Sequence, residues 1–264
     1  MRRPYRLVLY AVVMAAVTSA TSCTSMRSDW RTASREPVGL APDPAELKEA
    51  VIQVYGARTI GAKGLFGVHT WVAVKPAEAK EWTVYEVVGW RLRWSESAIV
   101  VHSRPPDARW FGAMPELYAD RRGPGVDELI ERIDKAARAY PYGGEYRAWP
   151  GPNSNTFTAW IARAVPELEV DLPATAIGKD YLGSSIFGAA PSGSGVQLSL
   201  GGVLGMSVSA VDGLEFNVLG LNFGVSPKGV KLPMVGRVGS SSEPSNRAEE
   251  SPPEFPPPKI SKLY

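Results

Sequence analysis

Short runs in which apolar and polar residues alternate dominate the sequence after about residue 183, and Gly and Ser residues separate them. Alternation of this kind is typical of strands that present two different faces, and a dipeptide such as Asp212-Gly213 is typical of a tight hairpin turn. We therefore expect a β meander over residues 183–239 and interpret its glycines as turn residues, not as a phosphate-binding loop. The expected strands are Val196–Leu200, Met206–Val211, Leu214–Val218 and Leu221–Val225.

Residues 44–182 mix strand-like and helix-like segments. The segment Arg104–Gly125 is rich in Pro and Gly, which predicts irregular structure there. The apolar content of the whole chain, 44%, is sufficient for a sizeable core and excludes wholesale disorder. The strands expected in this part are Val51–Tyr55, Val68–Val74, Trp82–Trp90 and Ser97–His102.

Two main helices are expected in the same part of the chain. Apolar residues at positions 126, 129, 130, 133, 136, 137 and 140 follow helical spacing, and a second apolar stripe begins near Ser154 and ends before Pro166. Asp43-Pro44 is typical of a helix start. The sequence thus predicts an α+β fold, in which an antiparallel sheet with two main helices (44–182) precedes the glycine-rich meander (183–239).

Residues 1–22 are typical of an export signal: the basic segment Met1–Arg6 precedes the short apolar run Leu7–Val17. Cys23, the single cysteine of the chain, follows. Ala20-Thr21-Ser22-Cys23 resembles the lipobox of bacterial lipoproteins, although Ala20 stands where Leu is favoured. The same residues also satisfy the small-x-small rule of ordinary secretory cleavage. A free cysteine is a liability in an oxidising compartment, which favours lipidation of Cys23.

A lipid on Cys23 would make the membrane a partner of the protein. Thr24 and Ser25 follow the cysteine, so an aspartate that retains lipoproteins at the inner membrane is absent. We therefore expect an outer-membrane lipoprotein that faces the periplasm, with a secreted protein or an inner-membrane anchor as alternatives. Residues 23–43 would form the tether, and the Ser-, Glu- and Pro-rich residues 240–264 a disordered tail.

Charge and composition exclude several classes of function. Lys and Arg number 29 and Asp and Glu 27, and three of the basic residues lie within residues 1–22, so the remainder carries 26 against 27. A near-neutral chain argues against nucleic acid as a partner. One cysteine and two histidines leave little for a metal site, and no P-loop, dinucleotide fingerprint or zinc motif is present. We expect neither a metal nor a cofactor.

One pair of motifs suggests chemistry. A strand that carries His69 in Gly67-Val68-His69-Thr70-Trp71 is followed much later by a helix start at Asn153-Ser154-Asn155-Thr156-Phe157. This order resembles the circularly permuted papain-like amidases and acyltransferases, in which a base histidine precedes a nucleophilic cysteine of the type Asn-Cys-x-x-Phe. The resemblance implies a papain-like core, with Ser154 in the place of the cysteine and Glu86 as the residue that orients His69.

Each of these residues also has a structural interpretation. His69 is either the general base or a hydrogen-bonded histidine within the sheet. Ser154 is either a nucleophile or a helix cap, and a serine gains less than a cysteine from a helix N-terminus. Glu86 either orients His69 or occupies an exposed strand face, and His102 is interpreted as structural.

Four further residues are candidates for substrate binding. Asn153 and Asn155 flank Ser154 at the expected helix start. Arg58 could contact an anionic group, although a solvated arginine is the commoner case. Trp71 either lines a groove suited to a sugar or acyl chain or packs in the core.

Six stretches of the chain are similar to a bacterial family known only as domain-of-unknown-function family 3750, which implies no activity. They are Tyr55–Thr59, Gly67–Trp71, Pro150–Trp160, Asp180–Gly188, Leu198–Gly205 and Leu219-Gly220-Leu221.

Two functions of different classes remain open. In the first, the protein is a non-catalytic envelope lipoprotein that binds peptidoglycan or a lipid or has a structural role. In the second, it is a hydrolase or acyltransferase that acts on an envelope amide or ester through Ser154 and His69. The absence of a cysteine at position 154 favours the non-catalytic function. The sequence nevertheless leaves open whether the protein is an enzyme.

Overall fold

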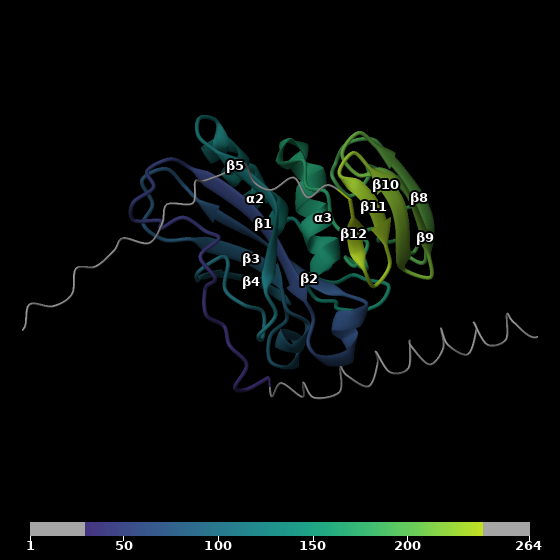
Figure 1. The fold of residues 1–264 in the computed structure, drawn as a ribbon, viewed down its shortest axis with the longest axis horizontal. Coiled ribbons are helices and arrows are strands. Elements are labelled where there is room, and N and C mark those ends of the chain that lie inside the picture. The colour runs from purple at the N-terminus through teal and green to yellow at the C-terminus, as the bar shows by residue number, and fades with distance from the viewer. Residues whose placement is uncertain (1–29, 240–264) are drawn as a thin grey trace, which may run out of the picture.

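The computed structural model describes residues 30–239, and they form an α+β fold with two antiparallel sheets, as the sequence predicts (Figure 1). The expected export signal, Cys23 and the tail 240–264 lie outside the described residues. Within 30–239, no helix combines the length and the apolar character needed to cross a membrane.

The first sheet has five strands in the order β4-β3-β2-β1-β5. β5 corrects the expectation of irregular structure in residues 104–125, because it pairs with β1 along seven registered positions. Four of the eight residues of β5 are charged, so no apolar alternation marks it, and backbone pairing at the sheet edge forms it instead. The strands are β1 (Val51–Arg58), β2 (Val68–Lys75), β3 (Thr83–Val87), β4 (Ile99–Ser103) and β5 (Pro115–Arg122).

The two main helices lie where the apolar spacing predicts them. They are α2 (Val126–Arg138) and α3 (Ser154–Ala164). The helix expected at Asp43 is wrong: only a turn forms, in which Asp43 Oδ1 accepts a hydrogen bond from Ala45 N at 2.8 Å. Three short 3-10 helices complete this part of the chain, namely η1 (Gly61–Leu65), η2 (Gly89–Arg93) and η3 (Pro166–Leu168).

The first sheet is covered on both faces, which explains why β1 and β2 are almost wholly buried. On one face, Val54 and Val72 pack with Phe157 and Ile161 of α3. On the other face, Tyr55 and Trp71 lie in a second cluster that residues before β1 and after β4 cover.

Asp107 fixes the chain that covers this second face. Its Oδ2 accepts hydrogen bonds from the backbone N–H groups of Val38, Leu40 and Ala41, at 3.3, 2.7 and 3.3 Å. Three donors on one buried carboxylate oxygen hold residues 38–41 against the sheet.

The second sheet is the predicted meander, and it lies beside α3 on one side of the molecule (Figure 1). Its seven strands follow one another in chain order, and β6, β11 and β12 add to the four runs that the sequence predicts. The strands are β6 (Phe187–Gly188), β7 (Val196–Leu200), β8 (Leu204–Ser209), β9 (Gly213–Val218), β10 (Leu221–Ser226), β11 (Gly229–Leu232) and β12 (Gly236–Val238).

Asn153 is the N-cap of α3. Its Oδ1 accepts hydrogen bonds from Asn155 N at 2.9 Å and Thr156 N at 3.2 Å, and Thr156 Oγ1 accepts one from Asn153 N at 3.1 Å. The Asn153 Nδ2 group also donates to Ala148 O and Ile177 O. The capping that the sequence allows for Ser154 therefore belongs to Asn153, and Ser154 is the first residue of the helix.

We expect Asn153→Ala to lower the free energy of unfolding by about 2–3 kcal/mol, because it removes an N-cap and leaves buried backbone groups without partners. Chemical denaturation of the two proteins measures the difference. Ser154→Ala is the matched control at the adjacent position, and its effect should stay within about 0.5 kcal/mol. Equal losses in the two variants would contradict the assignment of the cap.

Candidate functional site

A cavity of about 1020 Å³ opens where the first sheet, the start of α3 and the meander meet. Most of its wall is apolar, and five aromatic rings from four parts of the chain contribute to it: Phe66, Trp90, Trp110, Tyr146 and Trp149. Its polar wall residues include His69 and the three residues Asn153, Ser154 and Asn155. The two sequence motifs therefore meet at one cavity.

His69 lies near the start of β2 and is almost completely buried. Its Nε2 forms a hydrogen bond with Glu86 Oε2 at 2.8 Å. The ring of Trp110 stacks on the imidazole, with 3.7 Å between centroids and 13° between planes. When Glu86 is ionised, Nε2 carries the proton and donates, which leaves the lone pair of the neutral ring on Nδ1.

Glu86 joins two histidines. While Oε2 contacts His69, Oε1 contacts His102 Nε2 at 2.8 Å, and Arg104 Nε lies 3.5 Å from the same oxygen. Burial by itself would raise the pKa of Glu86. The hydrogen bonds from His102 and His69, with the charges of His69 and Arg104, outweigh burial and hold that pKa well below its usual range.

Ser154 shares the cavity wall with His69, but no hydrogen bond joins them. Within residues 30–239, Ser154 Oγ has no hydrogen-bond partner, while the Ser154 carbonyl accepts from Thr70 Oγ1 at 3.3 Å. The capping interaction already occupies the N–H groups of Asn155 and Thr156. Of the first three helical N–H groups, only that of Ser154 remains for a ligand or an oxyanion.

Asn155 has a structural role as well as a place in the cavity wall. Its Nδ2 donates to Val68 O at 3.1 Å and Ile177 O at 2.8 Å, and its Oδ1 accepts from Thr70 Oγ1 at 3.0 Å. The side chain therefore joins α3 to β2 and to the segment at Ile177. With its polar atoms in use, Asn155 shapes the cavity more than it offers hydrogen bonds to a ligand.

Arg58 and Trp71 do not line this cavity. Arg58 donates to the carbonyls of Gly64, Leu65 and Val235, and it borders a different cavity, of about 780 Å³. Trp71 is fully buried, and its Nε1 donates to Pro106 O at 2.7 Å. The structure thus brings His69, Glu86, Ser154 and both asparagines together. Arg58 lies outside this group, whereas Trp71 does not line the cavity but has its ring stacked on that of His69, with 5.8 Å between centroids.

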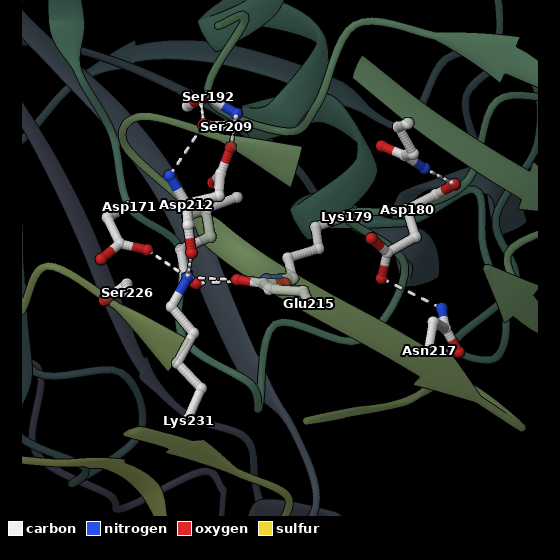
Figure 2. A network of polar contacts seen from close by, with 12 residues as sticks. Asp171, Lys179, Asp180, Ser192, Ser209, Asp212, Glu215, Asn217, Ser226 and Lys231 are labelled. Atoms are coloured by element: carbon white, nitrogen blue, oxygen red, sulfur yellow. Dashed lines mark hydrogen bonds and ion pairs between the residues drawn. The ribbon is translucent and has the colours of Figure 1, made fainter. Parts of the chain in front are cut away.

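A group of acidic residues lies between the meander and the chain that follows α3. Carboxylate oxygens of Asp171, Asp212 and Glu215 lie within 4.8 Å of one another. The ammonium group of Lys231 contacts Asp171 and Glu215, so a positive charge already lies among them (Figure 2). We interpret the group as an ion-pair network, because a cation would have to displace Lys231.

The family model described as "Protein of unknown function (DUF3750)" matches residues 49–181. The chain belongs to this family. The matched region contains β1 to α3 and therefore His69, Glu86 and Ser154, whereas the meander lies beyond it. No curated protein and no solved structure matches the chain. The papain-like resemblance accordingly stays a prediction.

His102, Arg104 and Trp110 are the residues of this site that the sequence did not reveal. In the register of β3 and β4, His102 lies opposite Val84. Val84 is two residues from Glu86, so His102 and Glu86 lie on the same face of the sheet. Only a correct pairing of these strands could have found it. Trp110 comes from a segment without regular structure, where spacing carries no information.

We expect Glu86→Gln to lower the free energy of unfolding by about 2–3 kcal/mol at neutral pH, because the buried His69 and the partly exposed His102 lose a charged partner. A carboxyl whose pKa is lowered by folding stabilises the folded state above its unfolded pKa. That stabilisation disappears as the pH falls through about 4.3 toward the folded value. The difference between the two proteins should therefore shrink in acid, as denaturation at several pH values measures.

Glu81→Gln is the matched control. Glu81 is exposed and accepts one hydrogen bond, from Ser103 Oγ at 2.9 Å. Its replacement should change the free energy of unfolding by less than about 0.5 kcal/mol at every pH. A Glu86→Gln effect that stays constant down to strong acid would show that the ionised carboxylate does not stabilise the fold.

Proposed function

We propose that the protein binds an amphipathic molecule with an acyl chain in the cavity at the start of α3. The observation that carries this proposal is the composition of the wall: aromatic and aliphatic side chains form most of it, and a smaller number of polar side chains, His69 and Ser154 among them, form the rest. Binding sites for small molecules commonly combine an apolar wall with a few fixed polar groups.

Unused polar atoms support a head group at this end of the cavity. Ser154 N, Ser154 Oγ and the Nδ1 atom of His69 have no hydrogen-bond partner among the described residues. Lys63 and Arg93 also belong to the wall and would attract an anionic head group. The carboxylate or phosphate ester of a lipid could both accept hydrogen bonds from these polar atoms and carry the negative charge that Lys63 and Arg93 attract.

The proposed location of the protein in the cell is consistent with a lipid ligand. We take Cys23 as the lipidated residue of an outer-membrane lipoprotein that faces the periplasm. The described chain begins at Trp30, seven residues later, and seven extended residues reach at most about 25 Å. A lipid on Cys23 would therefore hold the domain close to the bilayer from which an acyl ligand could come.

A hydrolase or acyltransferase is the second candidate, and one observation favours it. Glu86 holds the Nε2 of His69, and Nδ1 remains available as a base in the cavity that Ser154 also lines. In that mechanism, His69 takes the proton of Ser154 Oγ, which attacks an ester or amide carbonyl, and Ser154 N binds the oxyanion. The single available N–H group and the absence of a Ser154–His69 hydrogen bond in residues 30–239 place this candidate second.

We expect Cys23→Ser protein to bind a fluorescent long-chain fatty acid, with energy transfer from tryptophan as the readout. Trp90→Ala should weaken binding about tenfold or more, since the loss of about 1.4 kcal/mol of contact has this effect. Trp94→Ala is the matched control: it removes a neighbouring exposed tryptophan that does not line the cavity. Equal affinities for the two variants would contradict binding in this cavity.

The same preparation separates binding from catalysis. A fluorophosphonate probe and a fluorogenic acyl ester are added to the wild-type, Ser154→Ala and His69→Ala proteins. If the protein only binds its ligand, the wild-type protein should bind the acyl ester and should not hydrolyse it. Turnover or labelling that disappears in both variants, while their melting temperatures stay unchanged, would establish the second candidate instead.

The address has its own test. Labelled palmitate should enter the wild-type chain in cells and should not enter Cys23→Ser, because the thiol of Cys23 is the proposed attachment point. The labelled protein should fractionate with the outer membrane. Absence of label in both proteins would leave a secreted or otherwise anchored protein.

A further inference from the structure

The two faces of the meander have the opposite polarity to those of an ordinary sheet in a soluble protein: the apolar face points outward and the polar face inward. Along β7 to β12, alternate side chains that face away from the rest of the molecule are large and apolar, with exposed fractions between 37% and 69%. The residues between them are polar, charged or glycine, and most of them are buried. The outer face consists of Val196, Leu200, Leu204, Met206, Val208, Leu214, Phe216, Val218, Phe223, Val225, Val230, Leu232 and Val238.

Strand register makes these residues one continuous surface. Val208 lies opposite Leu214, and Leu214 lies opposite Val225. Farther along, Val225 lies opposite Val230, which lies opposite Val238. Cross-strand neighbours of this kind touch, so an unbroken apolar row extends from β8 to β12.

The inner face has the opposite character. Lys231 and Lys179 both contact Glu215, and Lys231 also contacts Asp171 (Figure 2). Burial would lower the pKa of Lys179, but the charge of Glu215 outweighs it and raises that pKa, so the pair stays ionised. The protein therefore uses the polar face of this sheet for internal contacts and leaves the apolar face without cover among residues 30–239.

The size of the apolar face makes its exposure costly. The six strands β7 to β12, at about 4.8 Å spacing and each about five residues of 3.3 Å, span a flat area of roughly 500 Å². This equals the largest apolar patches of typical monomers, which are often interaction sites. A sheet that is apolar on one face normally buries that face against a second layer.

We propose that the second layer is the same face of another copy of this chain, so that two meanders pack as a β-sandwich about a two-fold axis. The outer face has no charged side chain in β7 to β12, so self-association requires no buried charge. Two stacked sheets would bury a flat area of about 1,000 Å² in total, the minimum expected for a specific interface. Valine, leucine and phenylalanine are also the usual core residues of aligned sheets.

Two features favour a second copy over a lipid surface. Side chains that anchor proteins at bilayer interfaces are Trp, Tyr, Lys and Arg, and the outer face has none of them. The sheet is also open, with β6 and β12 at its edges. Immersion in lipid would bring unpaired backbone groups of these edges into an apolar medium, whereas packing of two faces leaves the edges in water.

Photo-crosslinking of the full-length chain in cells tests the proposal. A benzophenone amino acid is placed at Phe216, at the centre of the face, and at Val101 of β4 as an exposed control position. Irradiation should give a band of twice the monomer mass for position 216 only. Mass spectrometry should locate the crosslink within residues 196–238 of the second copy.

A second measurement guards against variants that fail to fold. With the photo-crosslinker at Val225, the changes Phe216→Asp and Met206→Lys should each reduce the dimer band at least tenfold, because a charge would be buried at the interface. Leu40→Asp, at an exposed apolar residue outside the sheet, should leave the band unchanged. Crosslinks to phospholipid, crosslinks to a different protein, or no crosslink at position 216 would each overturn the proposal.

Discussion

The side chains at the start of α3 hold together three parts of the chain that are distant in sequence. Asn155 donates to Val68 O in β2 and to Ile177 O, Asn153 donates to the same Ile177 carbonyl, and Thr156 Oγ1 donates to Gly178 O at 2.7 Å. The three side chains are buried, so a lost bond would leave one of their polar atoms unsatisfied. The position of Ser154 relative to His69, and hence the shape of the cavity, depends on this small network. The N-terminus of α3 therefore does more than cap the helix: its side chains connect β2, the helix and the chain that leads to the meander.

The sequence predicted the parts of the fold that repeat and missed those that depend on pairing. Helical spacing placed α2 within two residues of its observed end, and strict alternation placed β7 to β10. By contrast, β5 is mostly polar, and Pro and Gly surround it, so only its partner β1 defines it. The site shows the same division. The motifs located His69, Glu86 and Ser154, but His102 joins Glu86 through the β3–β4 register, and Trp110 reaches His69 from a segment without regular structure.

An alternating sequence predicts a strand with two different faces, but it does not show which of the two faces lies inside the protein. Apolar residues of the meander would ordinarily be assigned to the core. Here the row Gln197, Ser207, Glu215, Lys231 and Arg237 faces inward instead, with Gly224 between Glu215 and Lys231. A buried ion network of this kind is weak evidence for stability, because desolvation offsets much of the attraction. It is better understood as a device that fixes register, since a slip by one residue would place Lys231 in the apolar face.

The inner face of the meander is also connected to the candidate site. Asn217 Nδ2 donates to Asp180 Oδ2 at 3.0 Å, and Gln197 Nε2 donates to Asp180 O at 2.7 Å. Asp180 and its neighbour Lys179 directly follow Ile177 and Gly178, whose carbonyls accept bonds from the start of α3. The same segment thus accepts hydrogen bonds from the helix that carries Ser154 and forms polar contacts with the meander. Leu219 and Leu221 of the meander complete the cavity wall. Polar contacts therefore join the inner face of the meander to the segment that also holds the start of α3, and the face proposed to bind a second copy lies on the other side of the same sheet.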